Sequence, residues 1–181
     1  MHIKNILEFL CHSNEKLIYY GKHTSHNRML PYEKVKLVFV GDSGVGKTSL
    51  IQTLLQRPKS IPLPTVKADM YVHTQTIQTN AVKFQLWDTT DNSLHHLKGA
   101  DGCILIHDST NSLEQYLTKW DPIIREHTLS PIFLCHSHSE SIIPNNIYNE
   151  TYIIMAYPYN HTSLEPIYID IYKYIKDSRG Y

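Results

Sequence analysis

The sequence lacks any long apolar stretch. No segment approaches the ~18 consecutive apolar residues of a membrane-spanning helix, and no basic region followed by an apolar run opens the chain, so neither a membrane span nor a secretory signal is predicted. Residues 177–181 contain no cysteine that could carry a prenyl group, and His2 after Met1 excludes the usual myristoylation signal. We therefore expect a soluble, cytoplasmic chain with no intrinsic membrane anchor.

Charge of one sign is not in excess, and cysteine is rare. The 17 basic residues equal the 17 acidic residues in number, so nucleic acid and acidic membrane surfaces are not expected as partners. The three cysteines are an odd number, and Cys103 and Cys135 fall in apolar runs typical of buried strands. We expect both to be reduced core residues of a cytosolic-type protein.

Glycine is scarce as well, with 7 in 181 residues, and three of the seven are Gly41, Gly44 and Gly46. Residues 41–48 match the phosphate-loop pattern G-x-x-x-x-G-K-[ST] at every fixed position. The loop lies between an apolar run typical of a strand, residues 35–40, and a predicted helix, which is the context that supports the pattern. Glycine lets successive N–H groups turn into one concavity, where the α- and β-phosphates of a nucleotide can be held.

The side chains at the end of this loop supply charge and metal chemistry. Lys47 would neutralise the β- and γ-phosphates, the Thr48 hydroxyl would bind Mg²⁺, and the following helix would direct its positive N-terminal end at the phosphates. The predicted nucleotide-binding residues of this segment are Gly41, Asp42, Ser43, Gly44, Val45, Gly46, Lys47, Thr48 and Ser49.

Strands and helices are predicted to alternate along the chain. Apolar or alternating runs indicate strands at residues 35–40, 69–79, 82–87, 103–106, 131–135 and 152–156. The second and third of these strands are expected to pair around Asn80–Ala81. Helices are predicted from the phosphate loop to Arg57, from a capping box at residues 112–115 with a kink at Pro122, and from a capping box near Thr162.

This order of elements predicts an α/β fold. We expect a three-layer sandwich whose mostly parallel sheet has about six strands, including one antiparallel edge strand. Ligands of such sheets bind at the carboxyl ends of the strands, where residues 41–48 lie.

Residues 1–34 form a predicted N-terminal extension, and residues 35–178 form the predicted domain. Four apolar residues of the extension recur at helical spacing and indicate a short amphipathic helix that binds a partner or folds back: Ile3, Ile6, Leu7 and Leu10. The alternative is a metal site, in a spacing that matches no standard zinc pattern, built from Cys11, His12, His23 and His26.

The segment GDSGVGKTSL at residues 41–50 resembles the first motif of the Ras-superfamily small GTPases, most closely that of the Rab branch. The similarity can be followed from about Val35 to about Lys176. It implies the P-loop small GTPase fold, a guanine nucleotide (GTP or GDP) with Mg²⁺, and protein partners that act as Rab-type effectors or regulators. Such partners would contact residues 65–71 and the second switch.

The resemblance also implies residues on the metal side of the site. Thr65 follows Pro64 as in the family motif whose threonine binds Mg²⁺ and the γ-phosphate. Residues 86–89 match the family's WDTAG segment up to its third residue, so Asp88 is the expected outer-sphere partner of Mg²⁺.

The resemblance then fails at the second switch. Asp91 stands where the family has a glycine whose N–H contacts the γ-phosphate, and a carboxylate there would repel that phosphate. Asn92 replaces the water-positioning glutamine and is the one candidate catalytic residue. The segment up to Ala100 is also shorter than in the family. We expect GTP to bind less well than GDP and hydrolysis to be slow.

Base recognition departs further from the family. Ser137 and Ser139 replace the lysine and aspartate that read guanine, and Ala156 is the only residue kept from the later S-A-K motif. No aromatic residue between Phe39 and Tyr71 is present to cover the base. Histidines offer two alternative readings, as metal ligands or as base-stacking groups, at His95, His96, His136 and His138.

Three functions remain open at this point. The leading one is a divergent Rab-like GTPase that binds a guanine nucleotide through its phosphates and Mg²⁺. The second is a pseudo-GTPase scaffold, or Rab mimic, that engages protein partners without nucleotide cycling. The third, a change of specificity to ATP, rests only on the lost guanine contacts.

Overall fold

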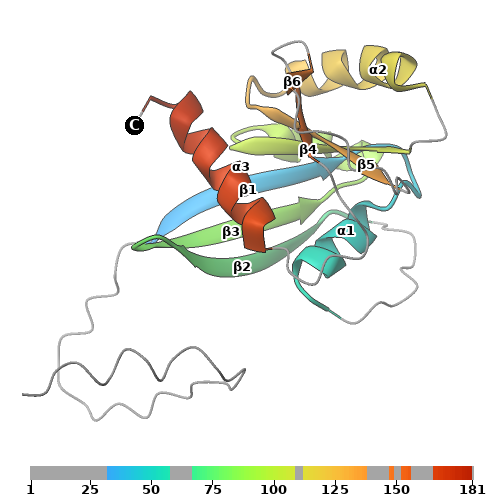
Figure 1. Cartoon of the computed structure of the whole chain (residues 1–181). Helices are drawn as coiled ribbons and strands as arrows, with labels where there is room; N and C mark the ends of the chain where they lie inside the picture. Colours follow the sequence, from blue (N-terminus) through green and yellow to red (C-terminus); the bar gives the residue numbers. More distant parts are fainter. Residues whose placement is uncertain are drawn as a thin grey trace, which may run out of the picture. The chain divides into compact units, whose positions relative to one another are not determined.

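A single sheet of seven strands forms the centre of the computed structural model, which describes residues 32–57, 67–108, 112–137, 147–148, 152–155 and 165–180. In spatial order the strands are β2, β3, β1, β4, β5, β7 and β6 (Figure 1). Their bounds are Glu33–Val40 (β1), Asp69–Ile77 (β2), Asn80–Asp88 (β3), Gly102–Asp108 (β4), Ile132–Ser137 (β5), Ile147–Tyr148 (β6) and Tyr152–Met155 (β7). The five inner strands are parallel, and each edge strand is antiparallel to its neighbour.

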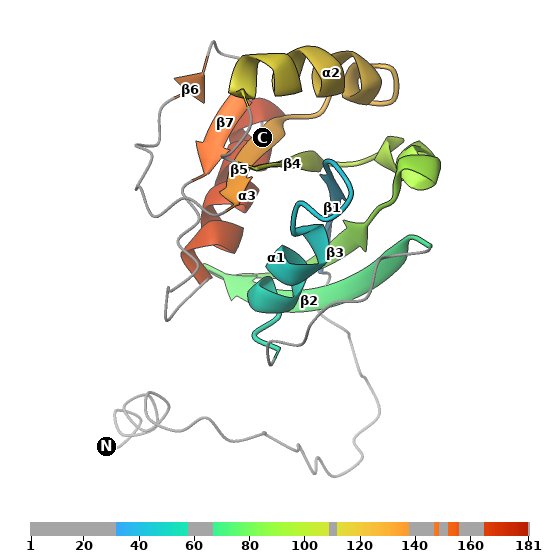
Figure 2. The same ribbon diagram turned by 90° about the vertical axis from the view of Figure 1, so that its right-hand side faces the viewer.

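Helices cover both faces of this sheet. They are α1 (Lys47–Leu54), the 3-10 helix η1 (Asp91–Leu97), α2 (Leu113–Arg125) and α3 (Glu165–Ser178). One apolar cluster joins the sheet to α1 and α3, and a second joins it to η1 and α2. Figure 2 shows α2 on the other side of the sheet from α1. The predicted α/β three-layer sandwich is therefore confirmed. The two-residue strand β6, at the edge opposite to β2, is an addition to the predicted sheet.

Strand β1 shows why the central strands read as continuous apolar runs. Val35, Leu37 and Phe39 belong to the cluster with α1 and α3, whereas Val38 and Val40 belong to the cluster with α2. Successive side chains of a strand point to opposite faces, so a strand covered on both sides needs apolar residues at nearly every position. Because β1 lies between β3 and β4, its carboxyl end is fixed in the sheet, and the loop starts from this point.

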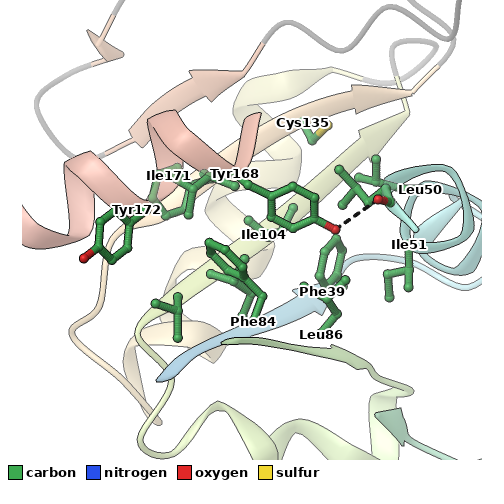
Figure 3. Packing of buried hydrophobic residues seen from close by; sticks show 14 of the residues in the cluster. Phe39, Leu50, Ile51, Phe84, Leu86, Ile104, Cys135, Tyr168, Ile171 and Tyr172 are labelled. Carbon is green, nitrogen blue, oxygen red and sulfur yellow. Dashed lines mark hydrogen bonds between the residues drawn. The ribbon is translucent and has the colours of Figure 1, made fainter. Parts of the chain in front are cut away.

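A tyrosine side chain connects α3 to α1. Tyr168 of α3 lies between the aromatic ring of Phe84 and the end of α1, where its hydroxyl donates to the Leu54 carbonyl oxygen at 3.1 Å (Figure 3). Ile171 and Tyr172 continue the same face of α3 (Figure 3). These residues form the face of the helix that packs on the core, and α3 starts at Glu165. The predicted start near Thr162 lies outside the described residues.

The hairpin between β2 and β3 turns two residues earlier than expected. Ile77 pairs with Asn80, so the turn consists of Gln78 and Thr79, and the prediction of a turn at Asn80–Ala81 is wrong. Gln78 takes the left-handed conformation with φ of 56°. Asparagine usually favours turns, but here the Asn80 side chain forms a hydrogen bond with Tyr172 of α3. The contact with α3 outweighs the local preference.

The predicted capping box at the start of α2 is also wrong, because its side-chain hydrogen bond is not formed. Ser112 is the N-cap residue, but its side chain makes no capping hydrogen bond. The helix continues through Pro122 to Arg125.

Two further expectations can be compared with the described residues. Cys103 and Cys135 are both free and buried, as predicted, and burial raises the pKa of Cys135 to about 12 and that of Cys103 in the same direction. Among the described residues, none of the helices has the length and apolar character needed to cross a membrane.

Candidate phosphate and metal site

The loop between β1 and α1 has the backbone that the glycine pattern predicts. Gly41, Gly44 and Gly46 have φ angles of 141°, 79° and 105°, all in the region that favours glycine. A Cβ on Gly41 would lie 2.6 Å from the carbonyl oxygen of Ile106 on β4, which leaves no room for any other residue. The loop therefore begins pressed against β4 and then opens towards solvent at Gly44, where a Cβ would meet nothing within 4 Å.

The Lys47 side chain binds the backbone at the start of the loop. Its Nζ donates to the carbonyl oxygens of Gly41, at 2.7 Å, and of Asp42, at 2.9 Å. The side chain is buried, and burial lowers the pKa of Lys47, which the charges of Asp88, Asp91 and Asp42 oppose. A buried ammonium with a fixed direction is suited to binding phosphate, because little reorganisation is needed when the anion arrives.

Two predicted metal-binding residues, one on α1 and one on β3, contact each other. The Thr48 Oγ1 donates to the Asp88 Oδ2 at 2.6 Å, so the first turn of α1 touches the end of β3. Asp88 is 1% exposed, and the Thr89 hydroxyl donates to the Phe39 carbonyl oxygen at 2.5 Å, which fixes the end of β3 against β1. A hydroxyl beside a carboxylate offers the hard oxygen ligands that Mg²⁺ prefers. The donor set therefore fits the metal that the sequence implies.

The second-switch segment is a short 3-10 helix. Asp91 and Asn92 open η1, and both are exposed. The buried Ser93 hydroxyl accepts the Thr90 N–H at 2.7 Å and donates to the Thr90 carbonyl oxygen at 2.9 Å, a local lock that sequence analysis missed. The signal was present, because Thr90 and Ser93 have the spacing of a capping box. Asp91 is close enough for its charge to act on Lys47.

The remaining predicted residues of this segment differ in burial and contacts. Val45 is buried in the cluster with α1 and α3, and the Ser49 carbonyl oxygen accepts the Thr53 hydroxyl at 2.8 Å. Ser43 is exposed at the tip of the loop. Thr65 and Ala156 lie outside the described residues and stay predictions.

For the part of the site that is expected to read the base, the structure describes only the backbone at the end of β5. Ser137 is the last residue of β5 and pairs with Asp108 of β4. The position that replaces the guanine-reading aspartate, Ser139, lies outside the described residues, as does His138. Specificity for the base therefore stays a prediction.

His96 of η1 stacks on Trp87 of β3, and the ring of His95 lies tilted beside that of His96. The rings of His95 and His96 lie 4.1 Å apart, and His96 lies 4.4 Å from the ring of Trp87 on β3. Burial, His95 and Lys36 lower the pKa of His96. Within the part of the chain that the structure describes, no group of three or more His, Cys, Asp or Glu could hold a metal ion, so His95 and His96 belong to no such group.

Sequence analysis also missed a contact from α2 to the loop. Tyr116, Lys119 and Trp120 all reach Asp42, which lies more than 70 residues earlier in the chain. No local signal could have found this contact, because it depends on how the sheet brings α2 beside β1.

The chain is similar to known proteins over the same part of its length. The family model described as "Ras of Complex, Roc, domain of DAPkinase" matches residues 36–140, which include the loop and Asp88. Ras-related protein Rab-7B of Dictyostelium discoideum is 32% identical over 88 residues, which cover 45% of this chain and 43% of that protein. Ras-related protein Rab-10 of Caenorhabditis elegans is 31% identical over 106 residues, covering 54% of this chain and 53% of that protein.

A third relative extends the comparison to fungi. The Ypt/Rab-type GTPase Rab7 of Neurospora crassa is 34% identical over 85 residues, which cover 43% of this chain and 42% of that protein. The chain spans about half the length of the curated relatives it matches.

Proposed function

Because the chain belongs to the Roc family of the Ras superfamily, as a divergent Rab-like small GTPase, we propose that it binds GDP or GTP together with Mg²⁺ in the loop between β1 and α1. The observation that carries the proposal is the meeting of Thr48 with Asp88 beside the buried ammonium of Lys47. Neither contact is needed to form a glycine turn, whereas both serve phosphate and metal binding.

Each of these residues has a separate task in the proposed site. Lys47 supplies positive charge at the β- and γ-phosphates, and its bonds to Gly41 and Asp42 hold the ammonium in place. Thr48 offers its hydroxyl to the metal, and Asp88 orients that hydroxyl by accepting its proton in a hydrogen bond. When bound, Mg²⁺ would neutralise further phosphate charge. Thr65 is the proposed contact with Mg²⁺ and the γ-phosphate, and Ala156 is the proposed contact with the base.

Hydrolysis is proposed to be slow. Asn92 is one methylene shorter than the glutamine that positions water in the family, and it lies exposed at the start of η1. A nucleophilic water that is displaced by about 1 Å reacts far more slowly, since rate depends steeply on alignment. The carboxylate of Asp91 adds repulsion at the γ-phosphate.

The second candidate function is a pseudo-GTPase scaffold. The position of Asp91 favours it, because the charge of this residue acts on Lys47 and so competes with a γ-phosphate for the ammonium. Such a protein would present a Rab-like surface to effector or regulator proteins without cycling between nucleotide states.

Calorimetric titration of nucleotide-stripped protein with GDP, GTP and ATP, each with and without Mg²⁺, tests the proposal. We expect Mg²⁺-dependent binding of GDP that is reduced more than 100-fold in Lys47→Ala, since a buried cation that faces phosphate is removed. Lys98→Ala, which removes an exposed lysine just after η1, is the matched control and should bind GDP as the wild type does.

Three other outcomes would be decisive. No heat with any nucleotide at high protein concentration would reject nucleotide binding and leave the scaffold. Binding of ATP as tight as that of GDP would show that the loop has lost base selectivity. Equal loss of affinity in Lys47→Ala and Lys98→Ala would show that nucleotide binds elsewhere.

A further inference from the structure

Helix α2 reaches the phosphate loop with one face. Tyr116, Lys119 and Trp120 are three and four residues apart, so their side chains project from the same side of the helix. All three end at Asp42, the second residue of the loop. We call these three residues the α2 clamp.

Tyr116 provides the buried part of the α2 clamp. Its hydroxyl accepts the N–H of Asp42 at 3.1 Å and donates to the Ile106 carbonyl oxygen on β4 at 2.6 Å. A Cβ on Gly41 would lie 2.8 Å from the same hydroxyl. One oxygen atom therefore joins α2, β4 and the first two residues of the loop. Burial raises the pKa of Tyr116, so the hydroxyl keeps the proton that the bond to Ile106 needs.

Lys119 and Trp120 hold the carboxylate of Asp42. The Lys119 Nζ lies 2.5 Å from Asp42 Oδ1, and the Trp120 Nε1 donates to the same oxygen at 3.1 Å. An acidic side chain in a phosphate-binding loop would repel the ligand, because like charges at short range are unfavourable. The α2 clamp offsets that charge and directs the carboxylate towards α2.

The main chain of Asp42 is engaged as well. Its carbonyl oxygen accepts Lys47 Nζ at 2.9 Å and the Val45 N–H at 3.4 Å. The N–H, the carbonyl and the carboxylate of Asp42 are thus all bonded within the protein. Asp42, which sequence analysis predicted to be a nucleotide-binding residue, acts here as the anchor of the loop.

We propose that the α2 clamp positions the phosphate loop for nucleotide, with Tyr116 as the main positioning residue, and that this role rests on the proposed function of the site. Three glycines at positive φ make the loop costly to order, because glycine loses more backbone freedom than other residues. A loop that is already held in its binding geometry binds more tightly, since the ordering is done before the ligand arrives.

The first experiment compares two tyrosine variants. Tyr116→Phe removes the hydroxyl that joins Asp42 to Ile106. Tyr168→Phe removes a buried hydroxyl that also donates to a backbone carbonyl oxygen, that of Leu54, but at the far end of α1. Tyr116→Phe loses two hydrogen bonds, those with Asp42 and Ile106, and Tyr168→Phe loses the one with Leu54, so both should be destabilised, Tyr116→Phe by more. Only Tyr116→Phe should affect the loop.

Two measurements separate positioning from stability. Amide hydrogen exchange of residues 41–46 in the nucleotide-free protein should become about tenfold faster in Tyr116→Phe, and the GDP dissociation rate should rise about tenfold, as expected when one hydrogen bond of this kind is lost. The dissociation rate of GTP should rise by the same factor, because the α2 clamp acts on the loop that is proposed to hold both nucleotides. Tyr168→Phe should change neither rate by more than twofold.

The charge part of the α2 clamp has its own test. Lys119→Met leaves the Asp42 carboxylate without its cation, and we expect GDP affinity to fall about threefold at low salt, with a smaller loss at high salt because of screening. Adding Asp42→Asn to that variant should restore the affinity, since the charge to be offset is gone. Failure of this rescue would show that Lys119 acts in some other way.

Exchange and dissociation distinguish the two proposals. If the wild type binds no nucleotide, the proposed function fails, while loop exchange in the free protein still tests the α2 clamp. If Tyr116→Phe leaves loop exchange and GDP dissociation at the wild-type values, the α2 clamp is rejected although nucleotide binding stands. Equal changes in Tyr116→Phe and Tyr168→Phe would also reject it, because they would show a loss of stability alone.

Discussion

At the scale of single residues, Asp91 is the side chain that we expect to weaken the binding of a γ-phosphate. It is exposed at the start of η1, yet its charge acts on both Lys47 and Tyr116. A carboxylate in this position attracts the same ammonium that a γ-phosphate would bind. The effect should depend on the third phosphate and leave GDP almost untouched.

Asp91→Gly is therefore expected to raise the affinity for GTP relative to GDP by about tenfold, or ~1.4 kcal/mol, because the repulsion is removed and a backbone N–H becomes accessible. Asp91→Asn is the control that removes charge but keeps the side chain, and it should recover only part of the gain. The ratio of the two dissociation constants, from competition titration, measures the effect. An unchanged ratio in both variants would show that Asp91 does not face the γ-phosphate.

Single residues also show which parts of the candidate site can be predicted from the sequence and which cannot. Lys47 and Thr48 were predicted from spacing alone, because eight adjacent positions define their geometry relative to the loop. Asp42 belonged to the same pattern, but its partners Tyr116 and Trp120 are 74 and 78 residues away. A contact between distant residues leaves no periodic signal in one sequence. The α2 clamp could therefore be found only in the fold.

At the scale of elements, η1 depends on the hydrogen bonds between Thr90 and Ser93. Ser93 is buried, and its hydroxyl satisfies the Thr90 N–H at the point where β3 passes into the second-switch segment. Without that hydroxyl the part-buried N–H would be left unbonded, which is more costly than the loss of an exposed bond.

We expect Ser93→Ala to lower the free energy of unfolding by about 1 kcal/mol in urea titration, and to speed amide exchange across residues 90–97. Ser178→Ala is the matched control, since it removes a hydroxyl that donates to the Ile175 carbonyl oxygen near the end of α3. That serine is exposed, so its loss should cost less than about 0.5 kcal/mol. Equal losses in the two variants would contradict a special role for Ser93.

Elements with a clear hydrophobic period were predictable, and their ends were less so. The central strands stood out because both faces are covered, and α2 because its apolar residues recur at helical spacing. The turn after Ile77 was misplaced since Asn80 bonds to Tyr172, a contact that local turn preferences do not include. The short strand β6 has too few residues to carry a pattern.

At the scale of the whole molecule, the fold class followed from the alternation of strands and helices, and the family followed from one loop. The two sides of the candidate site differ in how far the sequence predicts them. The sequence predicts the phosphate and metal side from Lys47, Thr48 and Asp88, which the structure brings together, whereas Ser139 and Ala156, predicted for the base side, lie outside the described residues. The distribution of charge gave little help, because acidic and basic residues balance.

Buried thiols give a test of the whole domain. Cys103 and Cys135 are 0% and 1% exposed, and burial raises the pKa of both, so each should react with thiol reagents only when the domain opens. In Cys11→Ser protein, GDP with Mg²⁺ at 100 times its dissociation constant should slow labelling about 100-fold, because ligand binds only the folded state. Labelling that is equally fast with and without GDP would contradict binding to the folded domain.

The positions of the two tryptophans have an optical consequence. Trp120 donates to the Asp42 carboxylate beside the phosphate loop, whereas Trp87 directly precedes Asp88 and stacks on His96 of η1. The tryptophan fluorescence of the protein therefore comes from one emitter beside the phosphate loop and one beside η1. Replacing either tryptophan by phenylalanine would leave the fluorescence of the other tryptophan alone. The movements of the loop and of η1 can then be timed separately without an attached dye.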